Sequence, residues 1–365
     1  MSLWPELDTP ALRIDLEKME RNLEEMAALA RARGVKMRPH TKTHKMPEIG
    51  RKQMDLGAVG LTVAKLGEAE VMARAGLRDL FVCYPLVGEH KVRRLRDLAR
   101  EANMMTIVES IEGARGLSAA MKGEGKALDV LIDLEVGYGR VGVAEERAGE
   151  LARLVDTLPG LRLRGVCIHE GNVYGEPDPE CRAQLARGQV EQMLGIARDL
   201  ASRGHNMEIV SCGSTPGARF TLEVEGITEI RPGNYVFYDT MQVALGTTDV
   251  EHCALSVVTT VVSHQEPGRA VIDAGAKALA LDKGLGIAAN GHGIVRDHPG
   301  ITVERLSEEH GWLRLGEGET VGIGDRLEVI PNHACVVTNL FNEVAVTRGD
   351  EVVEKWKVAG RGMLA

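Results

Sequence analysis

The sequence predicts an α/β protein in which a (β/α)8, TIM-like barrel is followed by a C-terminal β domain. Over the first two thirds of the chain, eight apolar runs alternate with amphipathic segments, which is the pattern of such a barrel. After about residue 246 the apolar runs become short, β-like and punctuated by turn residues. Doubly wound sheets also alternate strands with helices, but they usually have five or six strands, so the count of eight favours the barrel.

The first predicted helix begins after Asp15, whose side chain can cap it, and it ends at Gly34. Eight strands with near-continuous apolar residues then alternate with helices, as expected where both faces of a sheet are buried. These strands are predicted over residues 35–39, 60–64, 79–85, 105–110, 127–135, 163–171, 207–213 and 227–233. The 42 glycines are consistent with many tight turns between them.

Three regions follow from this pattern. Residues 1–14 form an N-terminal segment that we expect to pack with the β domain. Residues 15–246 form the barrel, close to the typical size of that fold. Residues 247–365 form the C-terminal β domain.

Composition excludes several classes of protein. The chain has 44 Lys+Arg and 53 Asp+Glu, a net charge of -9, which argues against nucleic acid as a partner. No apolar run is long enough to span a membrane, and the N-terminus has no signal-peptide features. Six cysteines are too few for a disulfide scaffold, and four of them lie in apolar runs, where reduced, buried thiols are expected. We therefore expect a cytoplasmic protein that acts on a small molecule.

The most unusual segment is residues 38–45, which reads RPHTKTHK and follows the first predicted strand. In α/β barrels the C-terminal ends of the strands carry the active site. Neighbouring positive charge favours the neutral amine of a lysine, and such an amine can bond to a carbonyl. The segment therefore predicts a reactive Lys42, with Lys45 as the alternative, although a solvated basic loop has the same composition.

Three glycine-rich turns follow later strands. Residues 137–142 match G-x-G-x-x-G, but they follow the fifth strand and lack an acidic strand end beyond them, so we do not predict a dinucleotide site. Residues 213–217 and 231–235 follow the seventh and eighth strands, where barrels often bind a phosphate. Together with a lysine after the first strand, these two turns predict pyridoxal phosphate, a phosphate-bearing carbonyl cofactor.

A possible metal site lies in the β domain. His333 and Cys335 are two residues apart, and on a strand both side chains would point to the same face. Two ligands alone make a weak site. His292, His298 and His310 fit no metal motif and are interpreted as surface histidines.

These motifs together resemble the fold-type III pyridoxal-phosphate enzymes, in the branch of D-threonine aldolase and D-serine dehydratase, whose first domain is an alanine racemase-like barrel. The similarity covers nearly the whole chain. The motifs that carry it are T-P-A-L at 9–12, R-P-H-x-K-x-H-K at 38–45, G-x-x-R-x-G at 137–142, H-x-G-N at 169–172, G-S-T-P at 213–216, R-P-G-N-Y at 231–235, D-A-G-x-K-A at 273–278 and P-N-H-x-C at 331–335.

The resemblance implies a role for each motif residue. Lys42 is the Schiff-base lysine, and Arg140 contacts the phenolic oxygen of the cofactor. His333 and Cys335 bind a divalent metal that faces the β-hydroxyl of the substrate. The remaining cofactor contacts are implied for His40, Asn172, Tyr174, Ser214, Thr215, Gly233, Asn234 and Tyr235. The resemblance also implies a homodimer.

The implied function is a metal-assisted lyase for β-hydroxy-D-amino acids, of the D-threonine aldolase type, with D-serine dehydratase as the alternative. Two departures weaken the aldolase assignment. Family aldolases use His-x-Asp, whereas this chain has His-x-Cys, which favours zinc over manganese or magnesium. Glu170 stands where those aldolases have a basic histidine, so either Glu170 or His169 is the predicted base.

Two further functions are less favoured. A racemase of this fold takes a tyrosine from the partner's β domain, and this chain has no tyrosine beyond Tyr238. A non-catalytic pyridoxal-phosphate-binding protein of the family is a single barrel, without a β domain.

Overall fold

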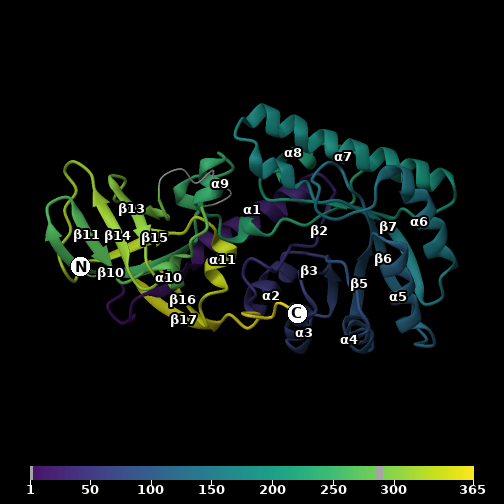
Figure 1. Cartoon of the computed structure of the whole chain (residues 1–365), viewed down its shortest axis with the longest axis horizontal. Helices are drawn as coiled ribbons and strands as arrows, with labels where there is room; N and C mark the ends of the chain where they lie inside the picture. Colours follow the sequence, from purple (N-terminus) through teal and green to yellow (C-terminus); the bar gives the residue numbers. More distant parts are fainter. Residues whose placement is uncertain (1–2, 284–290) are drawn as a thin grey trace. The chain divides into compact units, whose positions relative to one another are not determined.

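The computed structural model describes residues 3–283 and 291–365. The chain divides into two compact units, whose elements are labelled in Figure 1. The barrel unit comprises residues 26–42, 47–233 and 363–365, and the β unit comprises residues 1–25, 43–46 and 234–362. The division near residue 233 falls earlier in the chain than the boundary at 246 that the sequence pattern suggests.

The barrel unit contains eight parallel strands, in the order β2-β9-β8-β7-β6-β5-β4-β3. The ends of this order meet, because the Thr41 nitrogen donates to the Thr62 oxygen at 2.8 Å and the Thr62 nitrogen donates to the Pro39 oxygen at 2.9 Å. The predicted barrel fold is therefore confirmed. The strands are β2 (Lys36–Met37), β3 (Leu61–Val63), β4 (Asp79–Val82), β5 (Asn103–Val108), β6 (Leu128–Asp133), β7 (Leu161–Cys167), β8 (Ile209–Cys212) and β9 (Glu229–Ile230).

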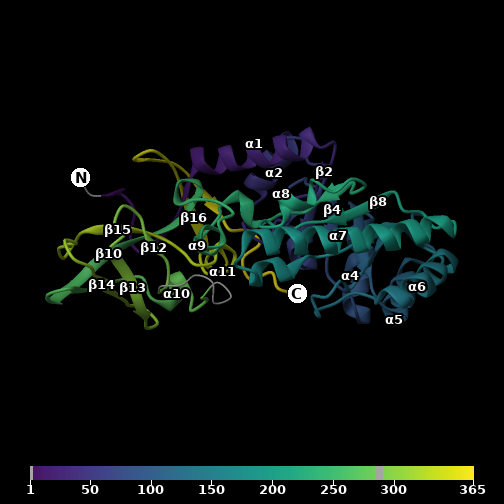
Figure 2. The ribbon, with the colours of Figure 1, turned by 90° about the horizontal axis from the view of Figure 1, so that it is seen from above.

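Helices alternate with these strands and surround them, as Figures 1 and 2 show for α3 to α7. They are α1 (Leu16–Ala32), which begins in the β unit, and α2 (Pro47–Asp55), α3 (Leu66–Arg74), α4 (Glu89–Ala99), α5 (Ile111–Met121), α6 (Glu145–Thr157), α7 (Pro179–Ser202) and α8 (Ala218–Thr221). The longest, α7, begins where Asp178 accepts hydrogen bonds from the Glu180 and Cys181 nitrogens, with Pro179 at its first position. No helix in the described part of the chain has the length and apolarity needed to span a membrane.

The interior of the barrel is aliphatic and sulfur-rich, in keeping with an aromatic content of 3%. One buried cluster consists of Phe81, Met105, Ile107, Leu131 and Cys167. Because these side chains come from β4, β5, β6 and β7, the cluster spans the interior and fixes the strand ends that carry the candidate site.

The β unit is built on a nine-stranded sheet, in the order β11-β14-β13-β12-β15-β10-β1-β16-β17. Since β11 also pairs with β10, six of these strands close into a small antiparallel barrel. The strands are β1 (Ala11–Asp15), β10 (Leu255–Glu266), β11 (Arg269–Ile272), β12 (Ile294–Val295), β13 (Ile301–Leu306), β14 (Gly311–Leu315), β15 (Arg326–Ile330), β16 (Glu343–Arg348) and β17 (Glu351–Lys357).

The N-terminal strand β1 lies inside this sheet, antiparallel to β10 and parallel to β16. Its Arg13 is buried and donates to Glu328 at 2.7 Å and to Thr347 at 2.8 Å. The first residues of the chain are therefore part of the β unit.

Three short α-helices interrupt the described part of the β unit, and the two after residue 246 lie where the sequence suggests only strands. They are α9 (Thr240–Ala244), α10 (Ala276–Leu279) and α11 (Ala334–Thr338). Each has five residues or fewer, too short to show helical periodicity in the sequence.

Candidate active site

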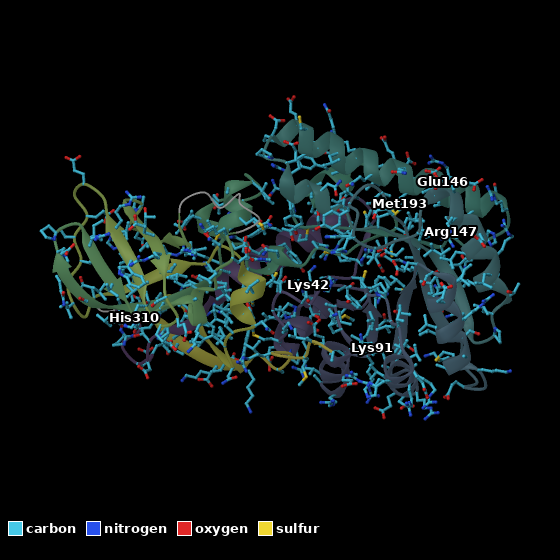
Figure 3. All side chains as sticks on the ribbon, viewed as in Figure 1. Lys42, Lys91, Glu146, Arg147, Met193 and His310 are labelled. Carbon is cyan, nitrogen blue, oxygen red and sulfur yellow. The ribbon has the colours of Figure 1, made fainter. Side chains whose placement is uncertain are left out.

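Lys42 lies beyond the C-terminal end of β2 and is labelled in the barrel unit in Figure 3. Its backbone nitrogen donates to His40 Nδ1 at 3.3 Å, and His40 forms a parallel bridge with Thr62 in β3. The charges of Lys42, Arg140 and Arg231 act together on His169. The barrel therefore brings the predicted lysine, arginine and histidine to one place, as parallel strands with a common end require.

The other cations of the 38–45 segment have different partners. Arg38 is buried and pairs with Asp79 and with Glu229, the latter at 2.9 Å, so it ties β2 to the barrel. Lys45 belongs to the β unit, where its Nζ donates to the Gly360 oxygen at 3.3 Å. These contacts favour Lys42 over Lys45 as the reactive amine.

His169 follows β7 and is surrounded by cations. Burial, followed by the charges of Lys42, Arg140 and Arg231, holds the pKa of its imidazole well below the usual value. Its ring meets the ring of Tyr138 edge to face, with centroids 5.7 Å apart. The imidazole is therefore neutral at physiological pH and can accept a proton.

Glu170, the other predicted base, is fully buried. One carboxylate oxygen accepts from the Gly213 nitrogen at 3.0 Å, and the other accepts from the Ser214 nitrogen at 2.8 Å. Burial raises the pKa of this carboxyl, and the backbone donors oppose the rise. Glu170 thus anchors the loop after β8.

A cluster that the sequence reasoning missed lies at the ends of β4, β6 and β7. The Cys83 and Cys167 thiols are hydrogen-bonded to each other, and Cys167 Sγ lies 3.6 Å from Asp133 Oδ1. The hydrogen bond with Cys167 lowers the pKa of Cys83, and the positive charges of Arg231 and Lys42 lower it further. Burial opposes this change, and the pKa of Cys83 is about 6.

Burial, and then the charge of Cys83, raises the pKa of Asp133 to about 8. The signal that could have found this cluster was the position of its residues at the carboxyl ends of barrel strands, rather than any motif. Arg231 stands in the predicted turn 231–235, but the sequence reasoning gave the arginine itself no role. Its guanidinium donates to the Ile168 oxygen at 2.8 Å and to Ser211 beneath the site.

The residues predicted to surround a cofactor fall into both units. In the barrel unit, Asn172 Nδ2 donates to the Gly137 oxygen at 2.9 Å, while its buried Oδ1 has no hydrogen-bond partner. Tyr174 lies in the same short 3-10 helix, η1 (Gly171–Gly175). Ser214, Thr215 and Gly233 lie in the barrel unit, after β8 and β9.

Asn234 and Tyr235 lie in η2 (Asn234–Val236), in the β unit. Asn234 Nδ2 donates to Asp239 Oδ2 at 2.6 Å, and Tyr235 is buried. Asp239 also accepts from the Ala334 nitrogen at 2.9 Å, which connects η2 to the start of α11.

The barrel residues suit the cofactor that the resemblance implies. Lys42 supplies an amine for its aldehyde, and two guanidinium groups, Arg140 and Arg231, are close enough to affect the same imidazole. The unpartnered buried oxygen of Asn172 is a further polar atom at this end of the barrel. However, Glu170 already occupies the Gly213 and Ser214 nitrogens, so phosphate binding by this loop depends on its hydroxyl groups and its remaining backbone donors.

The predicted metal pair lies on a different element from the one expected. His333 is the N-cap of α11 and Cys335 lies in its first turn, so the prediction of a strand at this point is wrong. The two side chains still meet, because they are hydrogen-bonded to each other. His333 Nδ1 lies 2.7 Å from Asp282 Oδ2, and Cys335 Sγ lies 3.1 Å from Thr43 Oγ1.

This pair fits a cation. Burial opposes a charged imidazole, but the negative charges of Cys335, Asp282 and Asp239 outweigh it and raise the pKa of His333 to about 11. A bound divalent metal would supply positive charge in the same place, and Asp282 would orient the imidazole. Within residues 3–283 and 291–365, no three or more His, Cys, Asp or Glu side chains form a metal-binding group.

Two other features carry no chemistry of this kind. Of the histidines interpreted as surface residues, His292 is in fact buried, whereas His298 pairs with Glu319 at 2.9 Å and His310 is exposed (Figure 3).

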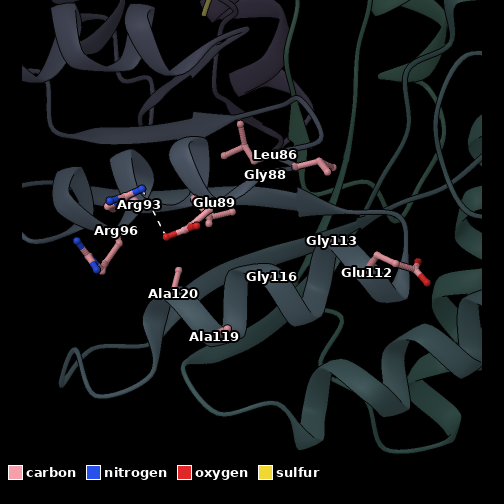
Figure 4. Close-up of a pocket in the computed structure, with 12 residues that line it drawn as sticks. Leu86, Gly88, Glu89, Arg93, Arg96, Glu112, Gly113, Gly116, Ala119 and Ala120 are labelled. Carbon is pink, nitrogen blue, oxygen red and sulfur yellow. Dashed lines mark ion pairs between the residues drawn. The ribbon is translucent and has the colours of Figure 1, made fainter.

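A groove on the barrel unit lies between α4 and α5, beside an ion pair of Arg93 with Glu89 at 3.5 Å (Figure 4). No predicted site residue lines it.

Comparison with known proteins identifies the family. Residues 14–240 match the model of the alanine racemase N-terminal domain, and residues 254–347 match that of a putative serine dehydratase domain. The chain belongs to the alanine racemase N-terminal domain family. Among curated members it is 33% identical to D-threo-3-hydroxyaspartate dehydratase of Delftia sp., over 96% of this chain and 97% of that protein. It is 32% identical to D-threonine aldolase of Arthrobacter sp., over 98% and 93%.

Solved structures of family members agree. The crystal structure of D-threonine aldolase from Filomicrobium marinum superposes with a TM-score of 0.90 at 33% identity, covering 99% of this chain and 97% of that one. A D-threo-3-hydroxyaspartate dehydratase has also been solved as two alanine variants, of a histidine and of a cysteine two positions beyond it. The structure of the cysteine variant is described as the metal-free form.

Proposed function

We propose that this protein is a pyridoxal-phosphate-dependent, metal-assisted lyase that acts on β-hydroxy-D-amino acids. The observation that carries the proposal is the position of Lys42 at the open end of the barrel, among Arg140, Arg231 and a neutral His169. Names of full-length relatives support the substrate class, since they include dehydratases and aldolases of such amino acids.

The roles of the barrel residues follow from their chemistry. When bound, pyridoxal phosphate supplies an electron sink for negative charge at the substrate's α-carbon. Lys42 holds the cofactor and then carries the α-proton. Arg140 is assigned to the phenolic oxygen, and the hydroxyls of Ser214 and Thr215 donate to the phosphate.

We assign removal of the β-hydroxyl proton, the step that aldol cleavage requires, to His169 rather than to Glu170. The imidazole is kept neutral by burial and by three cations, so it is ready to accept a proton. Both oxygens of Glu170 are engaged by backbone nitrogens beneath the next loop. A base must reach the proton that it removes, and these contacts direct Glu170 to a structural role.

His333 and Cys335 are the proposed metal ligands. Thiolate and imidazole together favour zinc. The metal-free cysteine variant of D-threo-3-hydroxyaspartate dehydratase supports this pair, because its histidine and cysteine have the same spacing. Cys335→Ala should therefore lower the metal content of the purified protein and its activity while leaving the cofactor bound; an unchanged metal content would exclude this ligand role.

Dehydration is the reaction that we place first, although the motifs alone suggest aldol cleavage first. D-threo-3-hydroxyaspartate dehydratase, the activity of a full-length relative, has been studied with alanine variants of a histidine and a cysteine that have the same spacing, which supports dehydration. Lys42 would remove the α-proton, and the metal, as a Lewis acid, would assist loss of the β-hydroxide. Aldol cleavage stays the second candidate, because a neutral His169 suits removal of a hydroxyl proton and the Arthrobacter aldolase is nearly as similar.

Racemization is disfavoured on different grounds from those expected. The sequence argument against a racemase was that the β domain contains no tyrosine. The unit boundary places Tyr235 and Tyr238 in the β unit, so that argument no longer applies. Both side chains are buried, at 1% and 7% exposed, which removes them as donors to a partner's site in this structure. A homodimer and a cytoplasmic location stay predictions.

Product analysis tests the proposal directly. The purified protein, loaded with pyridoxal phosphate and Zn²⁺, is incubated with D-threonine, D-serine and D-threo-3-hydroxyaspartate. A 2-oxo acid with ammonia supports dehydration, whereas glycine with an aldehyde supports aldol cleavage. If neither forms with any of the three, the proposed function is wrong.

The reactive lysine is tested separately. Lys42→Ala should abolish the borohydride-reducible absorbance of the bound cofactor, and Lys45→Ala is the matched control, since Lys45 donates to the Gly360 oxygen. The opposite result would move the Schiff-base assignment to Lys45.

A further inference from the structure

The loop after β6 forms a rigid support at the candidate site. The Glu135 carboxylate accepts from the Gly137 nitrogen at 2.6 Å and from the Gly139 nitrogen at 3.0 Å. Glu109 accepts from the Gly142 nitrogen at 2.9 Å. These bonds fix the backbone on both sides of Tyr138 and Arg140, so the positions of those two side chains are determined by the fold.

Tyr138 contacts both groups to which we have assigned chemistry. Its ring lies edge to face with the His169 imidazole, at 5.7 Å between centroids and 79° between planes. The Arg140 guanidinium carbon lies 5.2 Å from the centroid of the same ring. The Tyr138 side chain is 40% exposed, so it lies between the imidazole and solvent on one side of a small cavity that Arg140 and His169 also line.

Gly171 provides the space that this ring occupies. A Cβ atom added at residue 171 would lie 2.3 Å from Tyr138 Cζ and 2.4 Å from Cε1, far inside van der Waals contact. Gly175, at the other end of the same 3-10 helix, has nothing within 4 Å of an added Cβ. The glycine in H-x-G-N is thus required by the aromatic ring against it.

We propose that Tyr138 is a positioning residue, whose ring holds the His169 imidazole and the Arg140 guanidinium in their working orientation. The ring positions them through its edge-to-face contact with the imidazole and its contact with the guanidinium group. Its hydroxyl takes no part in proton transfer. The catalytic consequence rests on the proposed function in its aldol-cleavage form, because it assumes that His169 accepts the β-hydroxyl proton. The geometric part stands on the protein without cofactor.

The position of the ring has a measurable consequence for His169. The cations that face the imidazole are Lys42 after β2, Arg140 after β6 and Arg231 after β9, and a backbone hydrogen bond comes from Gly213 after β8. Asp133 and Glu135 line the cavity next to it. Burial is the largest cause of its lowered pKa, so a ring that leaves should admit water and let the imidazole titrate nearer its usual range.

The test follows the imidazole in the cofactor-free protein by NMR, with histidine labelled by 13C at Cε1 and the His169 signal assigned from His169→Gln. In the unmodified protein the ring should be neutral at pH 7, with a pKa below the usual range of histidine. Tyr138→Ala should raise the pKa of His169 by about one unit or more. Tyr138→Phe should behave like the unmodified protein.

Gly171→Ala provides an independent route, because its methyl group must displace the ring while Tyr138 itself is kept. It should reproduce the shift of Tyr138→Ala, and Gly175→Ala should not. If Tyr138→Ala does not fold, as judged by circular dichroism, this glycine pair decides the question. Tyr84→Ala is the control for loss of a tyrosine, since Tyr84 is 39% exposed and also carries a cation, Lys65, over its ring.

Activity then tests the catalytic consequence. Tyr138→Ala and Gly171→Ala should lower kcat about tenfold to a hundredfold, and Tyr138→Phe should keep it within about twofold. If Tyr138→Phe lowers kcat as much as Tyr138→Ala, the hydroxyl is catalytic and the inference is wrong. If the titration of His169 is unchanged in both Tyr138→Ala and Gly171→Ala, it is also wrong. A protein that shows these titrations but yields no lyase product would refute the proposed function and leave the positioning intact.

Discussion

Two glycine-rich loops of the barrel unit, residues 137–142 after β6 and residues 213–217 after β8, are built on the same plan. In each, a carboxylate of the same unit accepts from two backbone nitrogens of the loop. In the first loop that carboxylate is Glu135, which is accessible to solvent, and in the second it is Glu170, which is fully buried. The difference between the loops is therefore how deeply the anchoring charge lies.

In both loops the glycine-rich motif marks close backbone contacts, and it does not by itself indicate an anion-binding site. Gly142 has φ of 119°, and an added Cβ would lie 2.6 Å from the Glu135 nitrogen; Gly213 has φ of 137°, and its Cβ would lie 2.5 Å from the Arg231 nitrogen. The glycines are needed for these close approaches. They do not leave the backbone nitrogens free for an anion, because carboxylates occupy several of them. The chemistry of each loop then depends on the side chains that it presents.

The largest effect is expected for Glu170→Ala. The substitution leaves two buried backbone nitrogens without acceptors, and each unsatisfied group costs on the order of 1–3 kcal/mol, so the free energy of unfolding should fall by about 4 kcal/mol. The affinity for pyridoxal phosphate should fall with it, since Ser214 and Thr215 lie on the released loop. Urea unfolding and fluorescence titration with the cofactor measure the two effects.

Ser214→Ala is the control for that variant. It keeps Glu170 and its two backbone donors but removes a hydroxyl that accepts from the Gly217 nitrogen at 3.1 Å and donates to Glu170 Oε1 at 3.4 Å. It should therefore weaken cofactor binding and lower the free energy of unfolding by less than Glu170→Ala does. If Glu170→Ala lowers the free energy of unfolding by less than about 1 kcal/mol, water satisfies the loop nitrogens. The depth at which the anchoring carboxylate is buried would then not explain a difference in stability between the two loops.

The repeating part of the structure could be predicted from sequence. All eight barrel strands lie within or overlap the ranges expected from apolar runs, because a strand buried on both faces has a near-continuous apolar pattern. The position of Lys42 followed from its place after the first strand. The shared end of parallel strands then brings it near Arg140 and His169 without any local signal.

The rest depends on contacts that no local pattern encodes. Glu170 and His169 are adjacent in the chain, yet one side chain lies beneath the next loop and the other faces Lys42 and Arg140. Cys83 and Cys167 come from strands that are not neighbours in the sheet, and they meet only because the barrel closes. The helix at His333 is five residues long, below the length at which periodicity is detectable.

The next largest effect concerns Asp133, at the end of the strand that leads into the first loop. Its pKa is about 8 in the folded protein, against an ordinary value of 3.8 for an aspartate carboxyl. Between these values the folded state holds a proton that the unfolded chain has released, so the free energy of unfolding falls as pH rises. The slope is about 1.4 kcal/mol per pH unit, or roughly 2 kcal/mol between pH 4.5 and pH 6. Above pH 6 the Cys83 thiol, whose pKa is lowered to about 6, releases a proton that the unfolded chain keeps, and this offsets the Asp133 slope.

Asp133→Asn should remove this slope, and the variant should be more stable than the unmodified protein at pH 7 to pH 8. Urea unfolding of the cofactor-free protein at several pH values measures it. Cys83→Ser should keep most of the slope below pH 6, because burial raises the pKa of Asp133 more than the Cys83 charge does. It should also extend the slope above pH 6, because the opposing titration of Cys83 is removed. An unchanged slope in Asp133→Asn would show that the proton is held elsewhere.

The smallest effect is expected for Glu135→Ala, the counterpart of Glu170→Ala in the first loop. Its carboxylate also accepts from two backbone nitrogens, those of Gly137 and Gly139, but water can replace it because the site is open to solvent. The free energy of unfolding should fall by at most about 1 kcal/mol. The backbone around Tyr138 should become more mobile, so faster amide exchange at Gly137 and Gly139 is the sensitive readout. A loss as large as that of Glu170→Ala would mean that the two loops are anchored equally, and that the exposure of the carboxylate does not determine its contribution.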